Sequence, residues 1–173
     1  MYLDGAILLW IQENLRQDFL NPIVVFITSL GNAGIIWIVI SLLLLIPKKT
    51  RKIGILSLLA LLGSAIVNNL ILKNLVGRVR PYEVVDGLRL IIERQKDASF
   101  PSGHSGSSFA SAVVLYKNLP KTYGILALVL AALIALSRLY VGVHYPTDVL
   151  VGTIDGIIIG LVINKLGEHY GSV

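Results

Sequence analysis

The sequence predicts an all-α bundle of helices that crosses a membrane several times, and two observations support this fold class. Of the 173 residues, 55% are hydrophobic and only 14% are charged, whereas a soluble domain has roughly 25% charged residues. The apolar residues also come in runs of about 20, the length that a helix needs to cross a bilayer. We expect one domain over residues 1–173, with interfacial helices at 1–30 and a transmembrane core at 31–173.

The remaining composition limits which sites and partners are possible. The chain contains no cysteine, which excludes disulfides and thiolate metal sites. Its net charge is +5, and in a membrane protein such basic residues flank the spans and contact anionic lipid. We therefore expect membrane lipids and no nucleic acid as partners, while the oligomeric state stays open. We expect no cleavable signal peptide, because charged residues interrupt the first twenty positions.

The first quarter of the chain predicts interfacial structure followed by a span. Residues 2–17 place apolar side chains on one helical face and polar ones, Asp4 among them, on the other, which is typical of a helix lying in the membrane interface. Residues 19–46 carry no charge but are interrupted by "GNAG" at 31–34. This pattern predicts a short helix, a break and a span, with one long tilted span over 23–46 as the alternative.

Four further spans follow, which makes about five in total. The longest polar connection, residues 77–100, contains "LRLIIERQKD" at 88–97, which we expect to form another interfacial helix. The predicted spans after the first cover residues 53–75, 101–117, 121–139 and 146–165.

Basic residues in the short turns predict the orientation of the bundle. In the five-span arrangement they gather on one side, which the positive-inside rule makes cytoplasmic. The C-terminus then lies in the cytoplasm, and the 77–100 loop faces outward. The residues that carry this prediction are Lys48, Lys49, Arg51, Lys52, Lys117, Lys121 and Lys165.

Three polar segments stand at the ends of predicted spans: "KNLVGRVRP" at 73–81, "PSGH" at 101–104 and "SRLYVGVHYPTD" at 137–148. Each alone has an ordinary structural explanation, such as a snorkelling lysine or a helix cap. Because the third and fourth spans form a hairpin, however, all three segments emerge on the same face. Helix N-termini and arginine forks both bind phosphate oxygens. The sequence therefore predicts a phosphate site at the membrane surface, with its cations drawn from Lys73, Arg80, His104 and Arg138.

The same segments contain groups for nucleophilic catalysis. His144 and Asp148 have the H-x3-D spacing, which lets the carboxylate hydrogen-bond one imidazole nitrogen and leave the other free to attack. His104 is available as a general acid. The two histidines would act in opposite protonation states, and neighbouring charges separate such pKa values.

These three segments resemble the signature of the type 2 phosphatidic acid phosphatase (PAP2) superfamily, which includes membrane lipid phosphatases and soluble vanadium haloperoxidases. The signature is K-x6-R-P, P-S-G-H and S-R-x5-H-x3-D, and this chain matches all three parts in order and without departure over residues 73–148. Three ordered motifs are specific, whereas PSGH alone would be weak.

The resemblance implies a role for each matched residue. His144 would form a phosphohistidine, Asp148 would orient it, and His104 would protonate the leaving group and then activate water. No metal or cofactor is implied. The phosphoryl oxygens would be held by Lys73, Arg80, Ser102, Gly103 and Arg138.

The resemblance also narrows the substrate class. The length and hydrophobicity of the chain argue against the haloperoxidase branch and favour the small bacterial-type membrane enzymes. Many of these have six spans, and we expect this chain to lack the first. Undecaprenyl diphosphate is the favoured substrate, with phosphatidylglycerophosphate or phosphatidate next. The alternative is a non-catalytic lipid-phosphate binder or transporter.

One acidic residue lies outside the motifs. Asp155 follows Asp148 by seven positions, so it shares the same helical face but lies deeper in the membrane. An intramembrane carboxylate indicates a functional role. The hypothesis is that Asp155 hydrogen-bonds the second span and so fixes Lys73, and a role in packing alone is the alternative. The candidate partners are Ser64, Asn68 and Asn69.

Overall fold

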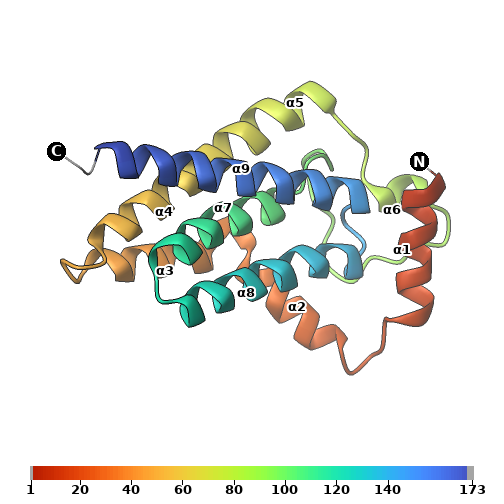
Figure 1. Ribbon diagram of the computed structural model, residues 1–173. Helices are drawn as coiled ribbons and strands as arrows, with labels where there is room; N and C mark the ends of the chain where they lie inside the picture. Colours follow the sequence, from red (N-terminus) through yellow and green to blue (C-terminus); the bar gives the residue numbers. More distant parts are fainter. Residues whose placement is uncertain (1, 171–173) are drawn as a thin grey trace.

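A computed structural model describes residues 2–170, which form helices and connecting loops without any strand (Figure 1). The predicted all-α fold is therefore confirmed for this part of the chain. The helices are α1 (Tyr2–Asn14), α2 (Asn21–Leu30), η1 (Asn32–Gly34), α3 (Ile35–Leu45), α4 (Arg51–Ser64), η2 (Ala65–Leu72), α5 (Lys73–Val76), α6 (Pro81–Val84), α7 (Gly103–Asn118), α8 (Lys121–Tyr140) and α9 (Pro146–Tyr170).

The long helices show that the protein crosses the membrane more than once. Within residues 2–170, three helices are long and apolar enough to span a bilayer: the one that begins at Arg51, then α8 and α9. The pair α2 and α3, bent by 48°, would make a fourth. The predicted span at 101–117 corresponds to α7, which has only 16 residues. The predicted total of five spans is therefore still a prediction.

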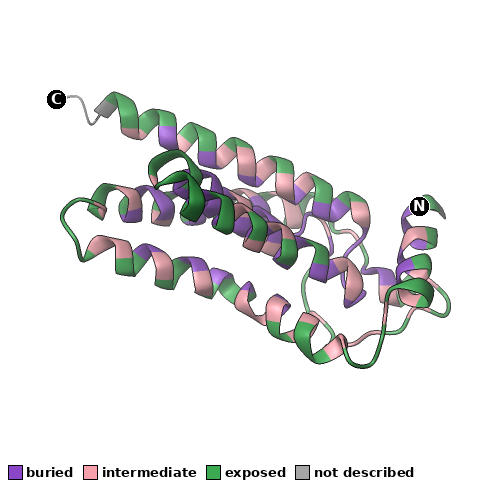
Figure 2. Ribbon diagram, turned by 60° about the horizontal axis from the view of Figure 1, so that its bottom comes forward, coloured by how far each residue is buried: buried purple, intermediate pink, exposed green. Residues whose placement is uncertain are grey.

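Helix α7 lies at the centre of the bundle, between α4, α8 and α9 (Figures 1 and 2). From Ser105 to Ala112 its buried residues are all serine, alanine or glycine, which allow neighbouring helices to approach closely. Hydroxyl groups then join the helices. Trp37 Nε1 donates to Ser108 Oγ at 2.9 Å, and Ser57 Oγ lies 2.7 Å from Ser111 Oγ. These contacts fix the position of α7, and with it the direction of its N-terminus.

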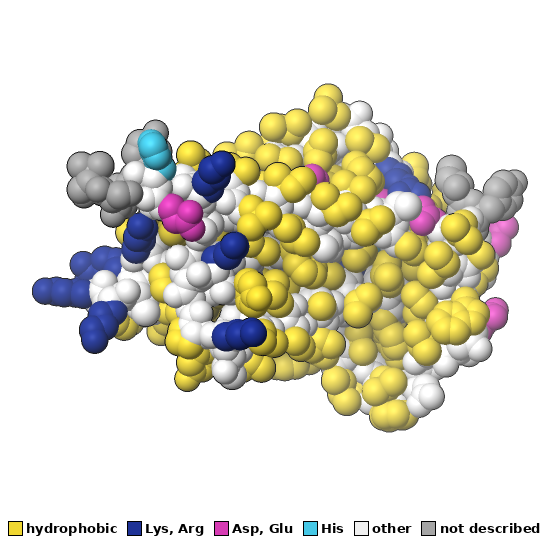
Figure 3. Space-filling view, in the orientation of Figure 1, with side chains coloured by type: hydrophobic (Ala, Val, Ile, Leu, Met, Phe, Trp, Pro, Cys, Tyr) yellow, Lys and Arg dark blue, Asp and Glu magenta, His cyan; other side chains and the backbone are white. Residues whose placement is uncertain are grey.

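The outer surface has an apolar middle and a basic end (Figure 3). Large exposed hydrophobic side chains occur along α3, α4, α8 and α9, where lipid tails would contact them. Lysine and arginine side chains gather at the end of the molecule that holds the α3–α4 and α7–α8 turns. The three signature segments lie toward the opposite end, beside α1 and α6 (Figure 1).

The break at residues 31–34 confirms the predicted short helix and its interruption, whereas the predicted span after the break corresponds to α3, of only 11 residues, and stays a prediction. Ala33 and Gly34 both have positive φ angles, 51° and 69°, and separate α2 from α3. Positive φ is uncommon for a non-glycine residue and often marks a functional turn.

The predicted interfacial helix at residues 88–97 is wrong, because the structure has an irregular loop there. Side chains of α1 and the residues just after it satisfy polar backbone groups of this loop. Gln12 accepts from the Arg89 N–H at 2.7 Å and donates to the Gly87 carbonyl at 3.0 Å, and Arg16 donates to the Arg89 carbonyl at 2.5 Å. Tertiary contacts thus replace the internal hydrogen bonds that a helix would have formed.

Candidate active site

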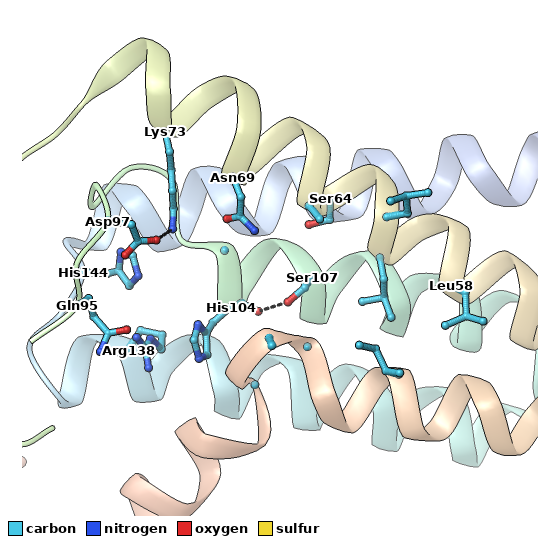
Figure 4. Close-up of a pocket in the computed structure, with 18 of the residues that line it drawn as sticks. Leu58, Ser64, Asn69, Lys73, Gln95, Asp97, His104, Ser107, Arg138 and His144 are labelled. Atoms are coloured by element: carbon cyan, nitrogen blue, oxygen red, sulfur yellow. Dashed lines mark hydrogen bonds and ion pairs between the residues drawn. The ribbon is translucent and has the colours of Figure 1, made fainter. Parts of the chain in front are cut away.

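The three signature segments meet around one cavity of about 590 Å³ (Figure 4). The extended segment before α6, the first turn of α7, the last turns of α8 and the α8–α9 loop each contribute a side chain. The structure thus brings together most of the predicted site. The predicted residues that line the cavity are Lys73, Arg80, Gly103, His104, Arg138 and His144.

His144 presents one ring nitrogen to an arginine. Arg80 Nη1 lies 3.2 Å from His144 Nε2 and 2.8 Å from the Val143 carbonyl. A guanidinium only donates hydrogen bonds, so Nε2 accepts and carries a lone pair. Burial, together with the nearby positive charges, lowers the pKa of His144 to about 3. The imidazole is therefore neutral near pH 7, as a nucleophile must be.

The predicted hydrogen bond between His144 and Asp148 is not formed at normal length. Nδ1 of His144 lies 3.5 Å from Asp148 Oδ2, which is within ion-pair range but long for a hydrogen bond. Two other donors hold the same oxygen: the Ser99 hydroxyl at 2.5 Å and the Tyr145 N–H at 3.0 Å. The carboxylate, which is fully buried, still faces the correct side of the ring.

His104 contacts the break between α2 and α3. Its Nε2 lies 3.0 Å from Asn32 Oδ1, and an amide oxygen only accepts, so Nε2 carries a proton. Gly31 makes this approach possible, because a Cβ there would lie 2.6 Å from His104 Cδ2. Sequence reasoning treated "GNAG" as a helix break only. An asparagine between glycines within an uncharged run was the available signal for a site residue.

A carboxylate occupies the space between two of the predicted phosphate-binding cations. Asp97 pairs with Lys73 and, at 2.6 Å from Oδ1 to Nη2, with Arg80. Burial alone would raise the pKa of Asp97, but hydrogen bonds and charge from the two cations outweigh it and lower the pKa to about 2. Asp97 was not predicted as a site residue. It stands where a phosphate oxygen would be expected.

The third predicted cation, Arg138, is buried and hydrogen-bonded to α2. Arg138 is 1% exposed, and its Nη1 donates to Thr28 Oγ1 at 2.7 Å. Its Nε is buried without a hydrogen-bond partner in the described part of the chain. Such a group leaves one donor available for an anion in the cavity.

The two predicted residues at the start of α7, Ser102 and Gly103, differ in whether they line the cavity. Gly103 lines the cavity, and a Cβ there would lie 2.8 Å from Asn69 Oδ1. Ser102 is fully buried and caps α7, accepting from the Ser105 N–H at 3.4 Å and from the Ser105 hydroxyl at 2.9 Å. Its side chain therefore does not line the cavity, and its place favours a structural role for this predicted phosphate ligand.

A second arginine of the first motif lies behind the dyad of His144 and Asp148. Arg78 Nη1 donates to Asp148 Oδ1 at 2.6 Å, and its Nη2 donates to Asp4 Oδ2 at 2.9 Å. The sequence indicated only an interfacial charge for Arg78 and a polar-face residue for Asp4. Asp4 is instead only 8% exposed. No local sequence signal could identify this pair, because 74 positions separate its members.

The hypothesis for Asp155 is wrong in its geometry. No hydrogen bond joins Asp155 to the second span in residues 2–170, and its Oδ2 is buried without a partner. Asn68 instead donates to Ser64 Oγ at 3.1 Å. The irregular π-helical turn η2, which carries Asn68, directs this side chain toward α7, where a Cβ on Gly106 would overlap it.

Metal ligation was not predicted, and residues 2–170 contain no group of three histidine, cysteine, aspartate or glutamate side chains that could hold a metal ion.

Comparisons with known proteins identify the family. Residues 54–169 match the PAP2 superfamily. An undecaprenyl-diphosphatase of Sulfolobus acidocaldarius is 39% identical over 79% of this chain and 66% of its own length. Phosphatidylglycerophosphatase B of Bacillus subtilis is 34% identical over 89% of this chain and 78% of its own length.

A solved structure shares the fold as well as the sequence. The transmembrane PAP2-type phosphatidylglycerolphosphate phosphatase from Bacillus subtilis superposes with a TM-score of 0.81 at 31% identity, covering 97% of this chain and 86% of its own. The chain therefore belongs to the PAP2 superfamily, among its membrane lipid phosphatases.

Proposed function

We propose that this protein hydrolyses undecaprenyl diphosphate without a metal ion, through a phosphohistidine on His144. Phosphatidylglycerophosphate and phosphatidate are the next candidates. The observation that carries the proposal is one cavity with a cationic end and an apolar wall. Such a cavity fits a molecule with a phosphate head and a hydrocarbon tail.

The apolar wall follows the membrane helices away from the cations. Beyond Lys73 and His104, toward the right in Figure 4, the cavity is lined mainly by α3 and α4. Its volume of about 590 Å³ holds a head group and the first part of a tail, so the rest of a long isoprenoid chain would lie in the bilayer. The residues of this wall include Ile38, Leu58, Leu61, Leu62 and Ala65.

In the first step, phosphate replaces the Asp97 carboxylate between Lys73 and Arg80. Movement of Arg80 onto the phosphate frees Nε2 of His144, which attacks phosphorus. The bond to the leaving oxygen breaks, and His104, cationic while the phosphate anion is bound beside it, donates a proton to that oxygen and becomes neutral. The Asp148 carboxylate stabilises the charge that His144 gains. Catalysis rests mainly on positioning and on stabilisation of charge by fixed cations.

In the second step, a water molecule attacks the phosphohistidine while neutral His104 accepts its proton. The P–N bond breaks, inorganic phosphate leaves, and Nε2 of His144 regains its lone pair. A lipid diphosphate would yield a lipid monophosphate and inorganic phosphate. A lipid monophosphate would yield the lipid alcohol and inorganic phosphate.

Purified protein tested on the three lipid phosphates decides between enzyme and binder. Wild type should release inorganic phosphate in the presence of EDTA, fastest from undecaprenyl diphosphate, and His144→Ala should release none. Acid-quenched wild type should carry labelled phosphate, and His144→Ala should not. Binding of all three lipids without release by wild type would instead establish the non-catalytic binder or transporter.

His104→Ala sharpens the choice of substrate. Cleavage of a lipid diphosphate expels a phosphate oxygen whose pKa is about 6, whereas cleavage of a monophosphate expels a far more basic alkoxide. The second reaction needs a general acid more, and such an acid contributes about 10²–10⁴-fold. We expect His104→Ala to lower the rate of phosphohistidine formation at least tenfold more with phosphatidate than with undecaprenyl diphosphate. Equal losses would contradict this role.

We also propose that the cavity opens to the outer side of the membrane, with the C-terminus in the cytoplasm. The gathering of basic residues at the opposite end of the bundle supports this orientation (Figure 3). Because the chain has no cysteine, single substitutions at the exposed Lys96 and Lys49 provide clean probes. An impermeant thiol reagent added to whole cells should label Lys96→Cys and not Lys49→Cys. The reverse pattern would invert the proposed orientation.

A further inference from the structure

We propose that Arg78 and Asp4 form a positioning pair that holds Asp148, and through it His144, from the side away from the substrate. This inference rests on the proposed function, because it assigns the pair to the nucleophile of that reaction. The three-part signature does not include either residue. Their contacts in the structure carry the proposal.

The first step concerns the carboxylate of Asp148, which is fully buried. Its Oδ2 is shared by Ser99, the Tyr145 N–H and, more distantly, His144. Its Oδ1 accepts from Arg78 at 2.6 Å. A buried carboxylate without a cation is strongly destabilised, so the ion pair with Arg78 favours the ionised form of Asp148 and holds its Oδ1.

The second step concerns how Arg78 is itself held. Besides Asp148, its guanidinium donates to Thr147 Oγ1 at 2.7 Å and to Asp4 Oδ2 at 2.9 Å. It also stacks on the Tyr145 ring, with its central carbon 3.8 Å from the ring centroid. A planar fork with several donors can make these contacts at once, whereas an ammonium cannot. The orientation of Arg78 is therefore fixed by partners on both sides.

The third step concerns where the pair lies. Arg80 lines the cavity, but Arg78, Asp4 and Asp148 do not. Arg78 thus reaches the dyad from behind and would not touch the substrate. Its effect on the reaction passes through Asp148, which makes it a positioning residue rather than a catalytic one.

The fourth step links the pair to α1. Asp4 Oδ2 also accepts from the Thr147 hydroxyl at 2.7 Å, so this carboxylate ties the first turn of α1 to the first turn of α9. The net charge of Asp4, Arg78 and Asp148 is −1. Removing Arg78 would leave −2 in the same place, and the extra negative charge would raise the pKa of the neighbouring His144.

The test compares Arg78→Met and Arg78→Lys with wild type in detergent, using undecaprenyl diphosphate. Arg94→Met is the matched control, because Arg94 is exposed in the same loop and its guanidinium lies over the Tyr82 ring. We expect Arg78→Met to lower kcat about 10- to 100-fold. A loss of this size is typical when the hydrogen-bond partner behind a metal-bound histidine is removed. KM and inhibition by inorganic phosphate should stay within about twofold, because the phosphate-binding cations are untouched.

The pH profile separates positioning from simple loss of stability. The acid limb of kcat/KM should move to higher pH in Arg78→Met, return part of the way in Arg78→Lys and stay at the wild-type pH in Arg94→Met. The charged or titratable groups that face His144 are Arg80, His104, Arg138 and Asp148, and these variants leave all four in place. An unmoved limb with wild-type kcat in Arg78→Met would overturn the proposal.

Milder variants keep the test decisive if Arg78→Met does not fold. Asp4→Asn and Thr147→Val each remove one support of the arginine, and both should lower kcat about threefold or more. Asp4→Asn also removes a negative charge, so its acid limb should move to lower pH, opposite to that of Arg78→Met, whereas the limb of Thr147→Val should stay near the wild-type pH. Wild-type kcat in both would overturn the proposal. Absence of turnover in wild type itself would instead contradict the proposed function, so the two failures are distinguishable.

Discussion

Arg78 and Arg80 are two residues apart, and each pairs with a carboxylate, but on opposite sides of the pair formed by His144 and Asp148. Arg80 faces the cavity and pairs with Asp97, whose side chain is 53% exposed. Arg78 faces away and pairs with Asp148, whose side chain is 0% exposed. An ion pair open to solvent exchanges partners easily, whereas a buried one is costly to break. The two pairs therefore differ as the proposed roles require, with a pair that phosphate can replace at Arg80 and a lasting support at Arg78.

The local backbone explains why neighbouring arginines diverge. Arg80 has extended angles, φ −70° and ψ 147°, and successive side chains of an extended segment alternate between its two sides. Residues 78 and 80 would share one side of a regular strand, so the short segment between Gly77, at φ 58°, and Pro81, which begins α6, departs from a regular strand. Partners on the two sides then complete the separation.

The largest expected effect comes from a change in the buried pair of Arg78 and Asp148. Asp148→Asn removes the charge that orients and stabilises His144, and an equivalent change in a serine protease triad lowers kcat about 10⁴-fold. We expect phosphohistidine formation to fall about 10³- to 10⁴-fold, measured by rapid acid quench with labelled substrate.

Asp155→Asn is the matched control for this change, because it alters an aspartate of the same helix two turns further along. Asp155 has no hydrogen bond to the second span, so this variant should stay within about threefold of wild type, as expected for a site away from the chemistry. A loss of activity in Asp155→Asn as large as that in Asp148→Asn would show that the effect is not specific to the carboxylate that pairs with Arg78.

A smaller effect is expected from a change in the partly exposed pair of Arg80 and Asp97. Arg80→Lys keeps a charge but loses the fork that reaches Asp97, the Val143 carbonyl and His144. We expect kcat/KM to fall about 10²-fold, with a rise in KM and weaker inhibition by inorganic phosphate. Arg78→Lys should lower kcat with KM unchanged. The same split for both variants would remove the distinction between the two arginines.

The sequence was sufficient for the parts of the site that lie at the ends of helices. Short turns and a helical hairpin leave few ways to arrange spans, so Lys73, His104 and Arg138 were correctly expected at one cavity. Contacts made by α1 and by the 77–100 loop were not predictable. Pairs such as Arg78 with Asp4 depend on how distant segments pack, and no spacing rule records that.

The conformation of the 77–100 loop explains why the sequence predicted a helix there and did not predict a place for Asp97 in the site. Its apolar residues at 88–92 suggested a helix, but hydrogen bonds to α1 decide its conformation. That conformation brings Asp97 to the cations. The break at residues 31–34 was predicted, but its part in the site was not, because the contact between Asn32 and His104 depends on how the turn with positive φ angles at Ala33 and Gly34 packs against α7.

The smallest expected effect tests whether phosphate takes the place of Asp97. Asp97→Asn removes the negative charge between Lys73 and Arg80, so inorganic phosphate should inhibit about three- to tenfold more strongly, a gain of about 1 kcal/mol as for a partly exposed ion pair. The pKa of Asp97, lowered to about 2, keeps it ionised throughout an assay range of about pH 5 to 8. Its pairing is complete above the unfolded pKa of 3.8 and is lost only as the pH falls toward 2.

Asp97 does not titrate over that pH range, so the stronger inhibition of Asp97→Asn should persist throughout it and change only as phosphate itself takes up its second negative charge. Glu93→Gln, which removes a negative charge from an exposed residue of the same loop, controls for a general electrostatic effect and should not strengthen inhibition. If phosphate inhibits Asp97→Asn less strongly than wild type, Asp97 aligns the two cations rather than competing with substrate. The Arg80 pair would then be a permanent support like that of Arg78, and the contrast between the two arginines would reduce to which side of His144 each one holds.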